Sequence, residues 1–233
     1  MYALFYNPDS NFYMWSTIHL ITIFIIFVVI ISLFYFREFL QPHRHMIRIT
    51  MGWTLIFSRL SLDFWYITTG QWSLQTSLPF ELCSIASILC AIMLFTKNRH
   101  LFEIFYFIAL AGAIQAILTP DLNFGFPQYR YIQFFIDHLL LIISPLIMIV
   151  LYGFTITRKS LIKSFLALNC IAIIIYFVNV LFSSNYMFLR RKPMSGSLLD
   201  LLGPYPYYIL SLEVVSLIIF IVLYIPFTWK SSN

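Results

Sequence analysis

Long apolar segments separated by short polar turns make up almost the whole chain. Seven of these segments are long enough to cross a membrane as helices. They predict helices at about 14–36, 46–69, 79–96, 102–118, 131–152, 161–183 and 205–227. The apolar runs are continuous and lack the strict alternation of transmembrane strands, which favours helices over a barrel. The pattern therefore predicts an all-α fold, a polytopic transmembrane helix bundle with about seven spans.

The composition indicates that lipid is the main solvent of this bundle. Of the 233 residues, 61% are hydrophobic and 10% are charged, whereas soluble domains typically carry about 25% charged residues. No polar stretch is long enough for a separate soluble domain, so residues 1–233 are expected to form a single transmembrane domain. The formal net charge of +5 is interpreted as a topology signal, and no nucleic acid partner is expected.

Lys and Arg residues are distributed unequally between the two ends of the predicted spans. Nine lie at the end that holds the connection 37–45, and four lie at the opposite end. Cytoplasmic loops carry the excess of positive charge, so the count predicts an external N-terminus and a cytoplasmic C-terminus. The expected location is the cell membrane, as a multi-pass protein.

Polar and ionisable residues within the spans gather in the half that is predicted to face outward. Arg59 and Asp63 are spaced i,i+4 on the second span and face the same way. Glu213, His138 and Asn179 fall in the same half on other spans. Ionisable groups in a membrane are costly unless they are paired or hydrated, and they usually mark a site. We therefore expect an outward-facing polar cavity, in which Arg59 or His138 is the partner of Glu213. A purely structural ion pair between Arg59 and Asp63 is the alternative.

Two reactive side chains, Cys83 and His138, lie at similar predicted depths. A thiol in apolar surroundings is unreactive, and a nearby imidazole can generate the thiolate nucleophile. Cys83, Ser87 and Cys90 also share one small-residue face of the third span, which suits close helix packing. Catalysis and plain packing are therefore both open for Cys83. No disulfide framework and no zinc-like Cys/His spacing is present, so neither a metal nor a cofactor is expected.

The predicted outer connection 184–204 contains the basic run Arg190, Arg191 and Lys192, against the positive-inside trend. Guanidinium groups match phosphate oxygens in shape and charge, so the phosphate of a lipid head group is one expected ligand. A solvated loop attracted to anionic head groups is the alternative.

Several segments resemble the YwaF-like family of bacterial integral membrane proteins. These segments are SLPFELC (77–83), NRHLFE (98–103), QAILTPDL (115–122), FFIDH (134–138), NYMFLRRKP (185–193) and SLLDLLGPYPYYILSLE (197–213). The resemblance covers about residues 50–227 and implies a helical membrane fold.

The YwaF-like family is distantly similar to the eukaryotic transmembrane protein 164 acyltransferases, and more remotely to the androgen-induced membrane lipid hydrolases. In the acyltransferases, a membrane cysteine and a histidine carry acyl transfer between phospholipids. The resemblance implies that Cys83 in LPFELC and His138 in FFIDH are the matching residues. Glu81 departs from the pattern, because members of the bacterial family often carry histidine at that position.

The leading hypothesis is a lipid acyltransferase or hydrolase that acts on membrane lipids, with Cys83 and His138 as catalytic residues. A transporter or binding protein for a small polar or anionic solute is the alternative, although the sequence lacks the inverted repeat common in transporters. A structural subunit whose polar groups serve assembly is a third hypothesis. The expected substrate-binding residues are Arg59, Asp63, Asn179, Arg190, Arg191, Lys192 and Glu213.

Overall fold

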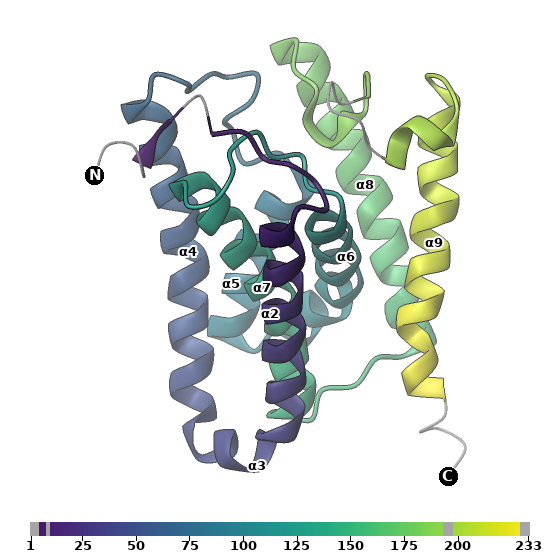
Figure 1. Cartoon of the computed structure of the whole chain (residues 1–233). Coiled ribbons are helices and arrows are strands. Elements are labelled where there is room, and N and C mark those ends of the chain that lie inside the picture. The colour runs from purple at the N-terminus through teal and green to yellow at the C-terminus, as the bar shows by residue number, and fades with distance from the viewer. Residues whose placement is uncertain (1–4, 8–9, 193–197, 229–233) are drawn as a thin grey trace.

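Long helices form the body of the computed structural model, which describes residues 5–7, 10–192 and 198–228 (Figure 1). The long helices are α2 (Thr17–Tyr35), α4 (Arg44–Thr68), α5 (Leu82–Thr96), α6 (Arg99–Leu118), α7 (Tyr129–Val150), α8 (Arg158–Phe182) and α9 (Tyr207–Thr228). Shorter helical turns are α3 (Arg37–Leu40), η1 (Gln41–His43), η2 (Tyr186–Phe188) and η3 (Leu198–Leu202). Among the described residues, pairing of extended backbone is limited to one isolated bridge between Asn11 and Phe124. The all-α prediction is confirmed.

The seven long helices of the described chain coincide with the seven predicted segments to within a few residues at each end. Five of them, α2, α6, α7, α8 and α9, are long and apolar enough to cross a membrane. Charged residues such as Arg59 and Asp63 interrupt the apolar sequence of α4. The 15 residues of α5 extend only about 22 Å. A membrane location is therefore supported, while seven spans and the orientation of the termini stay predictions.

Four helices, α4 to α7, form the centre of the bundle. α5 packs against α4 and α6, and α7 contacts all three of these helices. Large side chains of α6 and α7, such as Phe102, Phe107 and Leu141, are completely buried there. α2, α8 and α9 are strongly apolar and lie at the periphery, where few of their side chains are buried within the bundle. Such helices suit contact with lipid.

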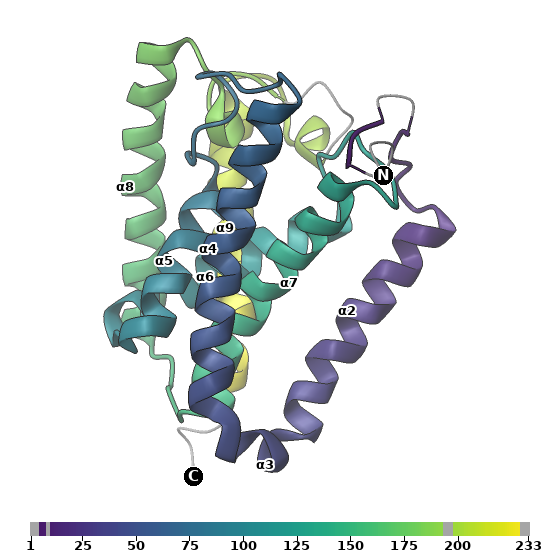
Figure 2. The same cartoon turned by 90° about the vertical axis from the view of Figure 1, so that its left-hand side faces the viewer.

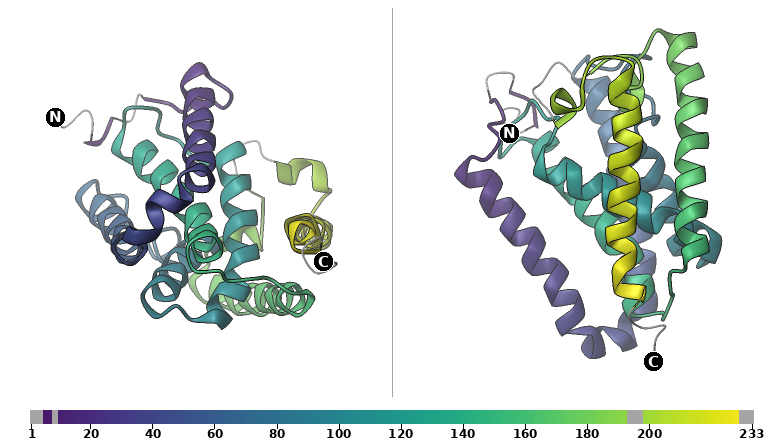
Figure 3. Two further views of the ribbon diagram at one scale, coloured as in Figure 1. Left: turned by 90° about the horizontal axis from the view of Figure 1, so that it is seen from below. Right: turned by 90° about the vertical axis from the view of Figure 1, so that its right-hand side faces the viewer.

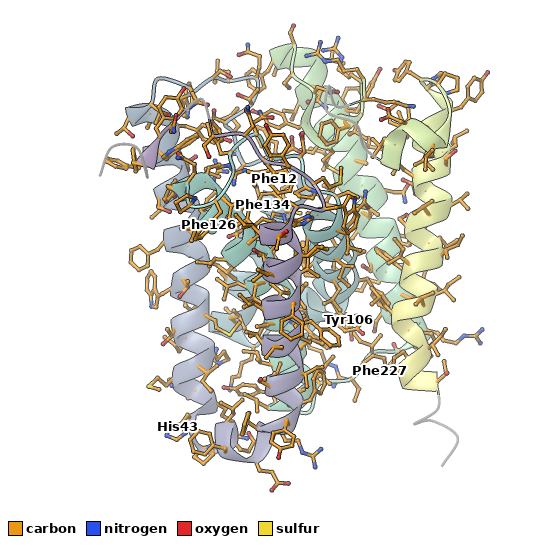
Figure 4. The ribbon with its side chains drawn as sticks, in the orientation of Figure 1. Phe12, His43, Tyr106, Phe126, Phe134 and Phe227 are labelled. Atoms are coloured by element: carbon orange, nitrogen blue, oxygen red, sulfur yellow. The ribbon has the colours of Figure 1, made fainter. Side chains whose placement is uncertain are left out.

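The peripheral helices attach to this centre in different ways. α2 slants away from α4, is joined to it through α3 and η1, and contacts the centre of the bundle at α7 (Figure 2). α8 and α9 stand on the side of the bundle away from α4 (Figure 3). α9 meets α6 at Tyr106, whose hydroxyl donates a 3.0 Å hydrogen bond to the Leu223 carbonyl and whose ring lies 5.6 Å from that of Phe227 (Figure 4).

One end of the bundle carries residues 69–81, 119–128 and 183–192, and is called the loop-rich end below (Figure 1). The segment before α2 crosses this end. The backbone N–H of Gly125 donates a 3.0 Å hydrogen bond to the Ser10 carbonyl. A Cβ atom at Gly125 would lie 2.6 Å from the Asn11 carbonyl oxygen, so this close approach of two backbones requires glycine. The segment before α2 therefore packs against residues 119–128 at the loop-rich end.

Candidate functional site

The predicted small-residue face of α5 is directed into the centre of the bundle. Cys83, Ser87 and Cys90 follow one another at spacings of four and three residues, which places them on one side of the helix. Ser87 and Cys90 are buried, and Cys83 is half-buried. A Cβ atom at Gly112 of α6 would lie 3.5 Å from Cys83 Sγ, so the thiol rests against the backbone of α6.

Ser87 links this face of α5 to α7. Its hydroxyl donates a 2.8 Å hydrogen bond to Oδ2 of Asp137, whose side chain is buried. The other carboxylate oxygen, Oδ1, is also buried and has no hydrogen-bond partner within the described part of the chain. A buried carboxylate with one hydrogen bond is an unusual feature, because such groups are normally paired or fully bonded.

His138 follows Asp137 on α7, and its ring orientation is fixed by α7 itself. Its Nδ1 atom lies 2.7 Å from the Phe134 carbonyl oxygen, so Nδ1 carries the hydrogen in the neutral ring. Nε2 then holds the free electron pair and is the atom available to accept a proton. The centroid of the Phe134 ring lies 4.1 Å from that of the imidazole, and the two rings are tilted by 34°. The guanidinium carbon of Arg130 lies 5.4 Å from the centre of the Phe134 ring.

Cys83 and His138 lie on helices that run side by side, but no direct hydrogen bond joins them among the described residues. The Ser87–Asp137 bond sets the level at which the two helices meet. Cys83 lies four residues before Ser87, so it is displaced toward the loop-rich end by about 6 Å at 1.5 Å per residue. The thiol and the imidazole are therefore not in direct hydrogen-bond contact among the described residues.

Arg59 joins α4 to α5 and to the loop before α5. Its guanidinium group bonds with the Asp63 carboxylate, so the predicted ion pair is present. It also donates a 2.6 Å hydrogen bond to the Ser77 carbonyl, and its Nη1 atom lies 3.5 Å from the Ser84 hydroxyl oxygen. Its Nε atom is buried without a partner in the described residues. Arg59 therefore holds helix and loop together in addition to pairing with Asp63.

A polar seam between α4 and α7 completes this group of residues. The Gln133 amide donates a 3.0 Å hydrogen bond to Ser58, and Arg130 donates one of 2.6 Å to Gln133 Oε1. The Tyr129 hydroxyl donates a 2.6 Å hydrogen bond to Ser61. Gln133 and the two serines are not among the residues predicted from the sequence to form the site, although an amide inside an apolar helix is itself a signal of polar contacts between helices.

Glu213 lies elsewhere, between α8 and α9. Its Oε2 atom accepts a 2.9 Å hydrogen bond from the Asn169 amide. The prediction of Arg59 or His138 as its partner is therefore wrong, because α9 packs against α8 and α6 and is separated from α4. The four residues invoked for solute transport, Arg59, Asp63, His138 and Glu213, are thus divided between two parts of the bundle.

Asn179 and the basic run organise the loop that follows α8. Asn179 is completely buried, and its amide oxygen accepts hydrogen bonds of 2.8 Å from the Ser184 hydroxyl and from the Tyr186 backbone N–H. Arg190 donates a 3.0 Å hydrogen bond to the Asn179 carbonyl, which satisfies the end of α8. Its guanidinium group is therefore already engaged.

The other two basic residues are less engaged. Lys192 lies 5.7 Å from the Tyr208 ring and 3.5 Å from the Asp200 carbonyl oxygen. Arg191 is exposed, and its guanidinium group makes no hydrogen bond with any described residue. Of the predicted phosphate ligands, Arg191 thus has the most accessible charge. No three His, Cys, Asp or Glu side chains of the described residues lie close enough together for a metal site.

Comparison with known proteins places this helical bundle in a family. A model of the TMEM164 family matches residues 12–224, from the segment before α2 into α9. The chain belongs to the TMEM164 family. No match was found among curated proteins or among solved structures. Membership of the TMEM164 family agrees with the membrane location, whereas the YwaF-like assignment stays a prediction.

Proposed function

We propose that this TMEM164-family protein is a membrane-embedded lipid acyltransferase or hydrolase that uses Cys83 as nucleophile and His138 as base. Family membership is compatible with an enzyme of membrane lipids. The observation that carries the proposal is the hydrogen bond between Ser87 and Asp137, which joins the helix of Cys83 to the helix of His138. It supports the pairing of these two residues within one polar region.

The proposed first half of the reaction forms an acyl-enzyme. The thiol proton of Cys83 passes to His138 Nε2 through one intervening hydroxyl or water. The thiolate attacks the ester carbonyl carbon of a lipid, the C–O bond breaks, and a Cys83 thioester forms. The leaving lipid alcohol takes its proton from the protonated His138 ring. His138 is then neutral again.

The second half releases the acyl chain. A second alcohol, or water, attacks the thioester carbonyl carbon and gives its proton to His138. The C–S bond breaks, and the proton returns from His138 to the Cys83 sulfur. An alcohol yields a new ester, so the protein is a transferase; water yields a fatty acid, so it is a hydrolase.

Basic residues at the loop-rich end can bind the phosphate of the lipid head group. Loop residues 185–192 lie directly over the start of α5, since Glu81 accepts a hydrogen bond from Met187. Cys83 is the second residue of α5. A phosphate held by Arg191, with Lys192 beside it, therefore lies at the end of the bundle that holds the nucleophile.

The experiment is detection of the thioester. Purified protein is incubated with a phospholipid that carries a labelled acyl chain, and the Cys83 peptide is analysed by mass spectrometry. The label is expected on Cys83 in the wild type, strongly reduced in His138→Asn and absent in Cys83→Ala. Cys90→Ala is the matched control, because Cys90 lies on the same face of α5 and is completely buried. A wild type that forms no labelled thioester on Cys83 would overturn the proposal.

A further inference from the structure

The proposed reaction leaves one buried charged group without a role. Asp137 is nine-tenths buried, Ser87 occupies its Oδ2 atom, and Oδ1 has no partner in the described residues. A carboxylate in apolar surroundings is stable only when an opposite charge or further hydrogen bonds compensate it. Among the described residues, the hydrogen bond from Ser87 is therefore the only one that compensates the Asp137 carboxylate.

Arg59 and Arg130 are already bonded to other groups, which leaves His138 as the partner for the Asp137 charge. Arg59 is paired with Asp63 and bonded to the Ser77 carbonyl. Arg130 donates to Gln133 and lies over the ring of Phe134. The remaining group is His138, the next residue on α7, whose ring is also buried.

We infer that Asp137 is a positioning residue of the proposed reaction, whose carboxylate is the counter-charge for the protonated ring of His138. The inference rests on the proposed function. His138 is neutral in the resting protein and protonated in both halves of the reaction, after it takes a proton from Cys83 and after it takes one from the accepting alcohol or water. A fixed negative charge beside the ring stabilises each of those states and costs no rearrangement, because α7 and Ser87 already hold it in place.

The proposed role of Asp137 is electrostatic and does not depend on a hydrogen bond to His138. Neighbouring residues on a helix point about 100° apart, and no hydrogen bond between the Asp137 carboxylate and the His138 ring exists in the described structure. The His138 ring is oriented by the Phe134 carbonyl instead. Asp137 thus acts on His138 through space, while its bond to Ser87 sets the register of α5 and α7.

The positive charge of Arg130 offers a second way to test whether nearby charges control protonation of His138. Arg130, Phe134 and His138 follow one another at four-residue spacings, so the Arg130 charge lies on the same side of α7 as the His138 ring. A positive charge opposes protonation of the ring, so its effect has the opposite sign to that of Asp137. A counter-charge role therefore predicts opposite changes when the two residues are neutralised.

The test compares variants in the thioester assay. Asp137→Asn removes the charge but keeps an acceptor for Ser87, Ser87→Ala removes the hydrogen bond but keeps the charge, and Asp137→Glu restores a carboxylate. We expect Asp137→Asn to lower kcat by about 100-fold or more with KM nearly unchanged, the size of effect seen when one preorganised electrostatic stabiliser is removed. Ser87→Ala should lose less, and Asp137→Glu should recover part of the rate. Arg130→Gln should raise kcat, and an unchanged or lower kcat in this variant contradicts the counter-charge role.

The outcomes distinguish the inference from the function on which it rests. If the wild type forms no thioester, the proposed function fails and the inference fails with it. If the wild type forms the thioester and Asp137→Asn forms it at a similar rate, the inference alone is overturned. Equal losses in Asp137→Asn and Ser87→Ala, or a loss in Arg130→Gln as large as that in Asp137→Asn, also overturn it, because packing then explains the effect. If Asp137→Asn does not fold, as judged by gel filtration and thermal unfolding, the sign of the Arg130→Gln effect decides.

Discussion

The Oε2 atom of Glu81 accepts a 2.9 Å hydrogen bond from the backbone N–H of Met187. This bond ties the loop after α8 to the residue that directly precedes α5. Met187 and Phe188 have φ angles of 57° and 52°, in the left-handed region that costs a residue other than glycine about 1 kcal/mol or more. Contacts to neighbouring segments must therefore hold this backbone, and the Glu81 carboxylate is one of them.

Removing the Glu81 carboxylate should loosen residues 185–192. We expect Glu81→Ala to increase trypsin cleavage after Arg190 and Arg191 in protein reconstituted into vesicles, because Met187 then loses its acceptor. Glu81→Gln is the control, since its amide oxygen can accept the same hydrogen bond. Cleavage of Glu81→Ala at the wild-type rate would contradict the expected role of this bond, as would equal cleavage of the two variants.

The positions of the helices were predictable from the sequence because each is one apolar run between polar turns. The start of α8 shows why the end of a helix can differ from the end of its apolar run. The apolar run predicted a helix from residue 161, but α8 begins at Arg158, because Thr157 and Ser160 form a capping box that includes the basic residues before the apolar run. Local hydrogen bonding thus extends a helix beyond its apolar part.

Contacts between helices were less predictable, as two carboxylates show. The sequence places Asp137 and Glu213 within spans, but their partners depend on how the helices rotate and which of them are neighbours. Asp137 meets Ser87 because α7 lies beside α5, and Glu213 meets Asn169 because α9 pairs with α8. Periodicity gives the face of a helix on which a residue lies, but not the helix that this face contacts.

The bond between Asn169 and Glu213 should contribute to the stability of the α8–α9 pair. We expect Asn169→Ala to reduce the free energy of unfolding by about 1 kcal/mol, since hydrogen bonds between membrane helices are typically worth this much or less. The double variant Asn169→Leu, Glu213→Leu should be more stable than Asn169→Ala, because it leaves no polar group without a partner. Unfolding in detergent, followed by circular dichroism, measures both. A double variant less stable than Asn169→Ala would argue against a paired role.

The two members of the Arg59–Asp63 pair should differ in importance. Arg59 also bonds to the Ser77 carbonyl and contacts Ser84, whereas the Asp63 side chain is 34% exposed. Arg59→Ala should therefore lower the Tm more than Asp63→Asn, because it removes the link between α4, α5 and the loop before α5. Thermal unfolding of the two purified variants gives the comparison. Equal shifts in Tm would mean that the ion pair alone matters.

Gly112 should limit access to the Cys83 thiol. A Cβ atom at Gly112 makes an ordinary contact of 3.5 Å with Sγ, so Gly112→Ala should fold and gain about 0.5–1 kcal/mol from higher helix propensity. Gly112→Val adds two methyl groups against the thiol and should slow its alkylation by a small reagent, read by mass spectrometry of the Cys83 peptide. Gly112→Ala serves as the size control. Wild-type alkylation of Gly112→Val would show that Sγ is approached from another side.

The orientation of the loop-rich end decides which leaflet the proposed site serves. Gln75 and Thr155 are both exposed and lie at opposite ends of the bundle, in the loop before α5 and in the loop before α8. Single cysteines at these positions, in a background with Cys83, Cys90 and Cys170 replaced by alanine, can be labelled with a maleimide that does not cross membranes. The excess of basic residues at the Thr155 end predicts that intact cells label Gln75→Cys and that Thr155→Cys reacts only after permeabilisation. The reverse pattern would place Cys83, at the start of α5, toward the cytoplasmic leaflet, and the lipid substrate would then have to come from that side.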